Sequence, residues 1–332
     1  MTDFRMRVAD LTVAVRSMYD RVARQCADYL LPSSGFESDR LTADIVVETT
    51  QPDIDRERDS EDTRTWRDDY LETLAVYRQI ADAAPALNRL LFHGATIEYG
   101  GRAYVFTAPS GTGKTTHIRQ WRRVLGERVD IINGDKPLFR VDRDGEPLAE
   151  GLAGRVIAYG TPWCGKEGWQ RNTSAPIAGI CVVTRAAGGT TVEDESAEVA
   201  ARAASSAPDA AVEGTAVDGA VAGNATADGT ASSGPTAASA AVREQSDVAR
   251  PGTVVFYDDA GIANTCVRLD PAEALPFILR QTYQPSSPLA VADMLGLLDA
   301  LFAAVPVYRL ACTISDAAVR ASFTAMVGEE LE

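Results

Sequence analysis

The sequence predicts an α/β fold, and three observations support this class. Short apolar runs typical of buried strands alternate with longer segments in which apolar residues recur at helical spacing. One strand-like run, Tyr104 to Thr107, leads into a glycine-rich stretch, and a predicted helix follows directly. The chain has 332 residues, which is enough for one large or two moderate domains with a sizeable core.

We expect the α/β domain to be assembled from two separate stretches. Residues 1–70 are assigned to a small N-terminal α+β region, and residues 71–185 together with 253–332 to the α/β domain. Between them, residues 186–252 are dominated by small and polar residues, with no sustained apolar periodicity. Because such a segment cannot bury enough apolar surface to offset its ordering entropy, we predict that it is a disordered insertion.

The elements before the glycine-rich stretch are predicted from periodicity and turn residues. A short strand is expected at residues 44–50, an exposed charged connection at 53–62, and a helix at 68–91, where apolar residues recur at roughly helical spacing. The next segment alternates apolar and polar residues around Gly100 and Gly101, which predicts a hairpin. The strand before the glycine-rich stretch is the second arm of that hairpin.

Later elements follow from the same reasoning. A strand is followed by a functional turn at "NGDKP", another strand and a tight turn at Asp144 and Gly145. A strand ending at Tyr159 and a strand at residues 177–183 come next. Two helices are then expected at 271–283 and 287–305. The sequence predicts a strand over "VYRLAC" and a final helix over "DAAVRASFTAMV".

Composition restricts the function classes. The formal net charge is -15, which disfavours attraction to a phosphate backbone and argues against nucleic acid as a partner. No apolar run approaches the length of a membrane span, and the N-terminal sequence lacks a cationic start followed by an apolar core, so we expect a cytoplasmic protein. The five cysteines are scattered without a C-x-x-C pair, which argues against a disulfide framework and a structural zinc.

The stretch "APSGTGKTT" predicts a phosphate-binding loop between a strand and a helix. The backbone N–H groups of such a loop, with the helix N-terminus behind them, favour anionic oxygens. In this motif Lys114 reaches the β- and γ-phosphates and Thr115 binds a divalent metal through its hydroxyl. We therefore expect ATP and Mg²⁺ as cofactors. The predicted nucleotide-binding residues are Ser110, Gly111, Thr112, Gly113, Lys114, Thr115 and Thr116.

A magnesium nucleotide requires a carboxylate near the metal, and two candidates compete. Asp135 lies 21 residues after Lys114, and Asp258 with Asp259 follows an apolar run that directly succeeds the low-complexity segment. We favour Asp135, because the intervening distance lets one helix return to an adjacent strand. The acid would then lie at the carboxyl end of that strand, beside the loop.

Lysine is rare in this chain, and its positions are informative. Of 32 basic residues only three are lysines: Lys114, Lys136 and Lys166. We infer that these positions favour a compact ammonium over a planar guanidinium. Lys166 lies in a loop between two tryptophans, where it either neutralises charge on a transferring phosphoryl group or is simply solvated. Lys136 is expected to be structural and to pair with Asp135 or a phosphate.

The order of His93-Gly94, strand, "APSGTGKTT", helix and "INGDKP" resembles the HPr kinase/phosphorylase group of bacterial P-loop kinases. The P-loop domain of that group is in turn similar to the phosphoenolpyruvate carboxykinases. The resemblance is specific over residues 92–140 and looser from there to the C-terminal strand and helix. It implies a P-loop nucleotide-binding domain of this type.

Carried over position by position, the resemblance implies roles for individual residues. Lys114 and Thr115 become the phosphate and metal groups, Asp135 the second of a pair of acids, and His93 the residue that orients that acid. The sequence departs from the pattern at Gly134, which occupies the place of the first acid. If the missing acid was the general base, Asp135 must combine metal binding with proton abstraction, or activity is reduced, and phosphorylase activity is not expected.

The predicted function is an ATP-dependent kinase that transfers the γ-phosphate to a serine or other hydroxyl of a protein, peptide or small molecule. The predicted catalytic residues are Asp135, His93, Lys114 and Lys166, with Thr115 and Asp135 as metal ligands. Two alternatives remain open: a nucleotide-binding regulatory module with little turnover, and a carboxykinase-like enzyme. The sequence also allows a homo-oligomer.

Overall fold

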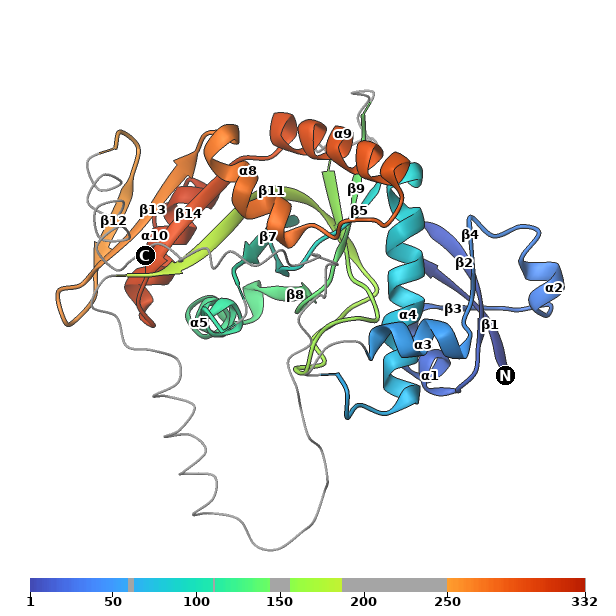
Figure 1. The fold of residues 1–332 in the computed structure, drawn as a ribbon. Helices are drawn as coiled ribbons and strands as arrows, with labels where there is room; N and C mark the ends of the chain where they lie inside the picture. The colour runs from blue at the N-terminus through green and yellow to red at the C-terminus, as the bar shows by residue number, and fades with distance from the viewer. Residues whose placement is uncertain (59–62, 110, 144–155, 187–249, 332) are drawn as a thin grey trace, which may run out of the picture.

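The computed structural model describes residues 1–58, 63–109, 111–143, 156–186 and 250–331. Within these ranges the chain forms a mixed α/β fold, with a small sheet near the N-terminus and a larger mixed sheet beside it (Figure 1). The predicted α/β class is confirmed at this level. Three predictions lie outside the described residues: most of the disordered insertion, the turn at Asp144 and Gly145, and the role of Ser110.

The N-terminal region is a four-stranded sheet packed against helices. Its elements are β1 (Thr2–Val8), β2 (Leu11–Ser17), α1 (Arg21–Gln25), β3 (Leu30–Leu31), α2 (Phe36–Asp39), β4 (Ile45–Glu48), α3 (Gln51–Glu57) and α4 (Asp68–Ala83). The strand order is β3-β1-β2-β4, with β1 and β2 antiparallel and β2 and β4 parallel. Val13 and Val47 of the sheet and Val76 and Ile80 of α4 belong to one buried cluster, which fixes the helix on the sheet.

The exposed connection predicted at residues 53–62 is wrong over its first part, where α3 forms. Thr50 and Asp53 make a capping box, and Pro52 lies in the first turn. Both features favour a helix start. The helix buries only Ile54, so its charged sequence reflects a solvated helix face rather than a loop.

The helix predicted at residues 68–91 ends earlier than expected. α4 stops at Ala83, a 3₁₀ turn covers Ala84–Leu87, and Asn88 has a left-handed φ of 61°. Pro85 lies in that turn, and a left-handed residue ends a helical path. The last predicted helical residues instead form the strand β5 (Arg89–Leu91).

The larger sheet contains the remaining strands. They are β6 (Ala95–Tyr99), β7 (Arg102–Thr107), β8 (Asp130–Asn133), β9 (Leu138–Val141), β10 (Val156–Tyr159), β11 (Ser174–Arg185), β12 (Val254–Tyr257), β13 (Ala263–Leu269) and β14 (Val307–Cys312). β11 spans both parts of this sheet: its start pairs antiparallel with β10, and its later residues pair parallel with β7 and β14. The predicted hairpin at Gly100 and Gly101 forms from β6 and β7.

The sheet corrects one prediction that bears on the site. β8 was expected next to β7, but β6 lies between them and pairs antiparallel with both. β7 and β8 therefore run in the same direction, so their carboxyl ends lie at the same edge as the beginning of β6. The hairpin explains the difference, because β6 already occupies the edge of β7 when the chain returns as β8.

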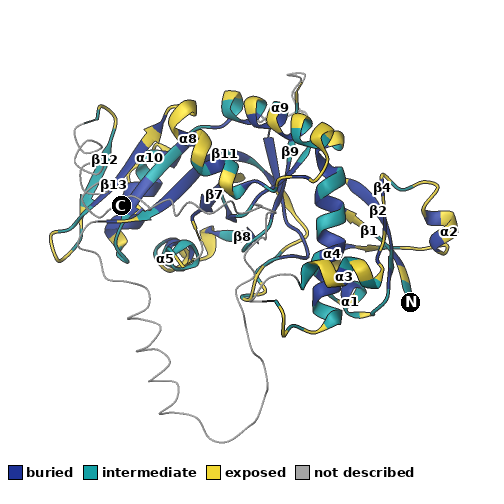
Figure 2. Ribbon diagram, viewed as in Figure 1, coloured by how far each residue is buried: buried dark blue, intermediate teal, exposed yellow. Residues whose placement is uncertain are grey.

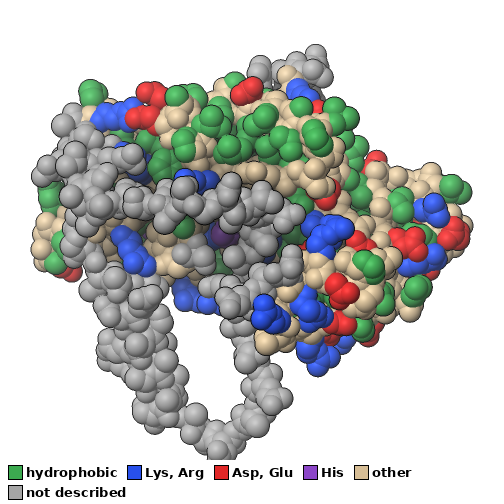
Figure 3. All heavy atoms as spheres, viewed as in Figure 1, with side chains coloured by type: hydrophobic (Ala, Val, Ile, Leu, Met, Phe, Trp, Pro, Cys, Tyr) green, Lys and Arg blue, Asp and Glu red, His purple; other side chains and the backbone are tan. Residues whose placement is uncertain are grey.

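The remaining helices cover the faces of this sheet: α5 (Lys114–Leu125), α8 (Pro271–Gln281), α9 (Pro288–Ala304) and α10 (Asp316–Val327). The predicted helices at 271–283 and 287–305 and the final strand and helix are confirmed within a few residues. The strands are largely buried, whereas the outer face of α9 is exposed (Figure 2). Hydrophobic side chains gather on that outer surface, including Leu289 and Leu295 (Figure 3).

Among the described residues, no helix combines the length and apolar character that a membrane span needs.

Candidate functional site

The glycine-rich loop joins the end of β7 to the beginning of α5. Gly111 and Gly113 have φ values of 74° and 114°, a region that residues with a Cβ rarely adopt. Gly113 is the N-cap of α5, and the first turn of the helix carries no acidic side chain. The helix therefore presents the positive end of its dipole at the loop without a carboxylate of its own to neutralise it.

A cluster of charged side chains surrounds Asp135 at this edge of the sheet. The Nε2 atom of His93 lies 3.2 Å from Oδ1 of Asp135 and 2.9 Å from Nζ of Lys114. Nζ of Lys114 is 3.7 Å from the same Oδ1, and Nζ of Lys136 is 3.2 Å from Oδ2. The loop lysine and the predicted acid thus meet, with a histidine between them.

The environment of Asp135 keeps it ionised. Burial alone would raise the pKa of this carboxyl, but the hydrogen bond from His93 and the charges of Lys136 and Lys114 outweigh burial and hold the pKa well below its usual range. Asp135 is therefore a carboxylate at any physiological pH. A carboxylate held this way is a good ligand for cations and a weak proton acceptor.

His93 is fixed by the end of α8. Its Nδ1 lies 2.8 Å from Oε1 of Gln281, and its backbone N–H donates to the carbonyl of Gln281 at 2.7 Å. The backbone around it joins the neighbouring strand ends, because the Thr107 hydroxyl donates to the His93 carbonyl and the Gly94 N–H donates to the Asp135 carbonyl. The backbone that carries the imidazole is thus held from both sides of β6.

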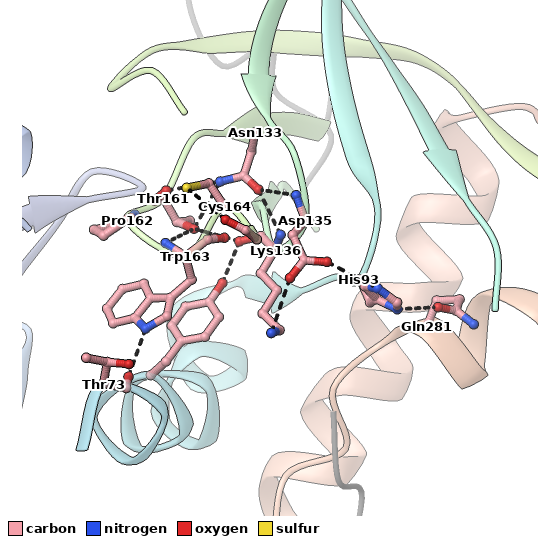
Figure 4. Close-up of polar contacts among 12 residues, drawn as sticks. Thr73, His93, Asn133, Asp135, Lys136, Thr161, Pro162, Trp163, Cys164 and Gln281 are labelled. Atoms are coloured by element: carbon pink, nitrogen blue, oxygen red, sulfur yellow. Dashed lines mark hydrogen bonds and ion pairs between the residues drawn. The ribbon is translucent and has the colours of Figure 1, made fainter. Parts of the chain in front are cut away.

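Asn133, the last residue of β8, shapes the turn that carries Asp135 and Lys136. Its Oδ1 accepts from the backbone N–H of Asp135 at 2.9 Å and of Lys136 at 2.7 Å, while its Nδ2 donates to the carbonyl of Thr161. The side chain is fully buried. Figure 4 shows the result: the Asp135 carboxylate lies between Lys136 and His93, and Gln281 stands behind the histidine.

Gly134 has no room for a side chain. A Cβ added there would lie 2.8 Å from the carbonyl oxygen of Cys164, and the Gly134 N–H donates to the carbonyl of Trp169. A side chain at this position would have to push the backbone of residues 161–169 away. This close approach of two backbone segments explains why Gly134, rather than a second acid, precedes Asp135. The sequence alone does not reveal the approach.

The segment at residues 161–169, here called the tryptophan loop, is anchored at its beginning on α4. Trp163 stacks on Tyr77 with ring centroids 4.1 Å apart, and its indole N–H donates to the carbonyl of Thr73. The Tyr77 hydroxyl in turn donates to the carbonyl of Lys136 at 2.6 Å. The same aromatic pair thus supports both the tryptophan loop and the turn carrying the acid.

The later part of the tryptophan loop passes Asp135 and reaches α5. A Cβ added at Gly165 would lie 3.1 Å from the Cβ of Asp135, and Glu167 forms an ion pair with Arg119 of α5 at 2.7 Å. Lys166 stands between these two contacts and is exposed. The structure therefore places Lys166 beside the charged cluster, with its side chain in solvent rather than against Asp135.

Three further polar residues of the domain, Arg171, Asn172 and His117, have structural partners. Arg171 forms an ion pair with Asp130, and the Asn172 amide donates to the carbonyl of Asp28. His117 is buried in α5, where the Trp121 indole N–H donates to its Nε2, and burial lowers its pKa to about 3. It has the character of a neutral core residue.

Asp258 follows β12. Across the sheet, it lies on the opposite side of the glycine-rich loop from Asp135, which follows β8. Its Oδ1 accepts from the backbone N–H groups of Ala260 and Ile262, and its Oδ2 accepts from the Thr313 hydroxyl at 2.8 Å. The carboxylate closes the turn after β12 and holds the segment that follows β14. Asp135, not Asp258, is the acid that meets Lys114.

Sequence reasoning missed two residues of this region. Gln281 is separated from His93 by 188 positions, and no local pattern marks it. Arg185, at the end of β11, donates from Nη2 to the carbonyl of Gly111 at 2.7 Å. Both lie at the ends of elements beside the loop, a position that could have been inferred only with the sheet order known.

No protein-family model matches the chain, and no curated protein matches it in sequence. Among the described residues, no group of three or more histidine, cysteine, aspartate or glutamate side chains is arranged to hold a metal ion.

Proposed function

We propose that the chain binds ATP with Mg²⁺ at the glycine-rich loop and transfers the γ-phosphoryl group to a hydroxyl of a protein, peptide or small molecule. On this proposal the α/β domain is a P-loop domain of the type found in the HPr kinase/phosphorylase group. The observation that carries it is the meeting of Lys114, His93 and Asp135 at the end of the loop.

The charge of the cluster supports an anionic ligand. The ammonium groups of Lys114 and Lys136 against one carboxylate leave a net charge of +1 in a chain whose formal net charge is -15. Two of the three lysines in the chain contact the same carboxylate, and the third lies in the loop packed on it. Concentrated positive charge at a helix N-terminus favours phosphate oxygens.

The donor set fits magnesium. Mg²⁺ prefers oxygen ligands and is held in nucleotide sites by one or two protein groups, with phosphate oxygens and water completing its shell. The Thr115 hydroxyl and the Asp135 carboxylate are such groups, and Asp135 already faces cations with both of its oxygens. When bound, the ion would neutralise negative charge on the phosphate oxygens.

The transfer itself asks little of the protein. The acceptor oxygen forms a bond to the γ-phosphorus, the bond from that phosphorus to the β–γ bridging oxygen breaks, and ADP leaves. Lys114 stabilises the charge on the phosphates, and Asp135 receives the hydroxyl proton late in the step, when the oxygen has become acidic. His93, held by Gln281, keeps the carboxylate aimed at the loop.

The direct test uses γ-labelled ATP, Mg²⁺ and a panel of hydroxyl-bearing acceptors. The wild-type protein should transfer label, and Lys114→Ala should reduce transfer by about 10³-fold, because the lysine neutralises the transferring group. Arg122→Ala is the matched control, since Arg122 is an exposed cation on the same helix. Transfer that persists in the Lys114 variant would overturn the proposal.

A second function is favoured by the acid site itself. Gly134 leaves no room for a second acid, and the lowered pKa of Asp135 makes it a weak base. Both features suit a nucleotide-binding module that turns over slowly. Tight ATP binding by calorimetry without acceptor-dependent ADP formation would support this function over the kinase.

A further inference from the structure

Helix α9 is apolar on both of its faces. Met294, Leu297 and Leu301 on the inner face are buried in the core of the larger sheet. Hydrophobic side chains also cover much of the outer surface of the helix (Figure 3). Its exposed residues, apart from Asp299, are Pro288, Leu289, Ala292, Leu295 and Ala303. Because a helix that is apolar all round is normally buried on all sides, the outer face of α9 has the composition of a contact surface.

We propose that the outer face of α9 is a dimerisation surface, on which the α9 helix of a second copy of the chain packs antiparallel about a two-fold axis near Gly296. This inference goes beyond the proposed function and does not depend on it. The exposed residues 289, 292, 295, 299 and 303 recur at intervals of three or four positions, which is the spacing of a seam between two packed helices. In a two-fold dimer the same patch serves both copies, so the patch must complement itself.

The side-chain sizes along α9 meet this requirement. Leu289 lies seven positions before Gly296 and Ala303 lies seven positions after it, so an antiparallel pair sets the leucine of each copy against the alanine of the other. At the centre, the nearest heavy atom to a Cβ added at Gly296 is 3.9 Å away, in the Arg143 guanidinium. The backbone there is therefore open to a close approach, and the two Leu295 side chains meet beside the axis.

The charges in the middle of α9 are also complementary between two copies. Arg143 lies over Gly296, and its Nη2 is 3.3 Å from Oδ1 of Asp293. Asp299 is exposed and forms no ion pair with any other described residue. Asp293 is three positions before Gly296 and Asp299 three positions after it, so an antiparallel pair brings Asp299 of the partner subunit level with Asp293. The guanidinium of Arg143 can then bridge the two carboxylates, once in each copy.

A membrane surface fits this face less well than a second copy does. α9 contains no lysine or arginine, and the chain has a formal net charge of -15, so anionic lipids would repel it. The contact is small: a helix of 17 residues is about 25 Å long, and one helix pair buries less than the roughly 800 Å² per partner of a standard interface. We therefore expect a reversible dimer with a Kd of about 1–50 µM.

Sedimentation equilibrium of the full chain at about 1–200 µM measures the dimer. The mass of the wild-type protein should rise from 35.4 kDa toward twice that value. Leu295→Glu places a carboxylate from each copy beside the axis and should raise the Kd about 30-fold or more, through repulsion and lost apolar contact. Leu275→Glu is the matched control, because Leu275 on α8 is 41% exposed and Leu295 is 45% exposed. It should leave the Kd within about twofold of wild type.

Oxidative cross-linking with copper phenanthroline in air tests the antiparallel order, with the wild-type chain as the background for its native cysteines. Leu295→Cys should give a disulfide-linked dimer, whereas Ala303→Cys should not, because the two copies of residue 303 lie about 20 Å apart along the helices.

A wild-type protein that stays monomeric, a dimer that Leu295→Glu leaves intact, or one that Leu275→Glu weakens equally would overturn the proposal. Cross-linking through Ala303→Cys but not Leu295→Cys would overturn the antiparallel arrangement. If circular dichroism shows that Leu295→Glu is unfolded, Leu295→Ser replaces it, and an unchanged Kd in that variant would likewise overturn the proposal.

Discussion

The two histidines of the chain lie in opposite environments, 24 positions apart. His93 stands at an edge of the sheet, partly exposed, among Lys114, Asp135 and Gln281. His117 is buried inside the domain, with the Trp121 indole and the Ser322 hydroxyl as polar partners. A histidine among charges can act on a ligand, whereas one among neutral core groups can only contribute to stability.

The largest expected effect concerns the buried histidine and pH. The pKa of His117 falls from 6.5 unfolded to about 3 folded because of burial, so between these values the unfolded chain binds one more proton. Stability is therefore fully present above pH 6.5 and is lost as the pH falls toward 3, by up to about 5 kcal/mol. Urea unfolding should show about 2 kcal/mol of this loss between pH 7 and 5.

The same experiment has an internal check. His117→Gln keeps a polar group of similar reach in the core but cannot take up a proton, so its unfolding free energy should lose most of that dependence between pH 7 and 5. A variant that keeps the full dependence would show that other groups cause it. The burial of His117 would then no longer explain the contrast between the two histidines.

The second effect concerns the partner of the exposed histidine. Asp135→Asn removes the carboxylate but keeps the shape of the side chain, and should lower phosphoryl transfer by about 10³-fold, within the range expected for a general base. Steady-state kinetics on the best acceptor measures the loss. A variant with unchanged kcat would assign Asp135 to structure, along with the polar groups around His117.

From the sequence alone, the individual strands and helices of the larger sheet are predicted better than the order in which its strands lie side by side. The hairpin at Gly100 and Gly101, the strand over "VYRLAC" and the final helix depend on local periodicity and turn residues, and they form as predicted. Thr50 and Asp53 form the capping box of α3, but the charged residues around them led to the prediction of an exposed connection instead of a helix. Strand order was harder, because the hairpin that places β6 beside β7 also displaces β8.

The sequence likewise predicts the local parts of the candidate site but not the contacts between distant segments. The glycine-rich stretch and the rarity of lysine identify Lys114 and Lys136 from local sequence, and a resemblance singles out His93 and Asp135. The structure brings these four side chains together, while their chemical roles stay predictions. Gln281 joins them from 188 positions away, and the absence of a side chain at Gly134 depends on the carbonyl of Cys164. Contacts between distant segments leave no mark in the pattern of one sequence.

The third effect concerns the partner of the buried histidine. The Ser322 hydroxyl accepts from the Trp121 indole at 2.9 Å, lies 3.1 Å from Nε2 of His117, and donates to the carbonyl of Ala318. Ser322→Ala removes these contacts and should cost about 1–2 kcal/mol of unfolding free energy. Chemical denaturation at pH 7 measures it, and a change below about 0.3 kcal/mol would mean that the buried cluster adds little to stability.

The smallest expected change in unfolding free energy comes from His93, and it decides whether the two histidines really differ in role. His93→Gln keeps a polar side chain beside Gln281 and Asp135 but loses the rigid ring that holds the carboxylate toward Lys114. We expect kcat to fall about 10-fold to 100-fold, the KM for ATP to change less than threefold, and the unfolding free energy to change by less than about 1 kcal/mol, as is usual for a partly exposed site. If stability instead falls as far as in Ser322→Ala while kcat is unchanged, His93 is a structural residue like His117. The charged cluster would then bind phosphate without any help from its imidazole.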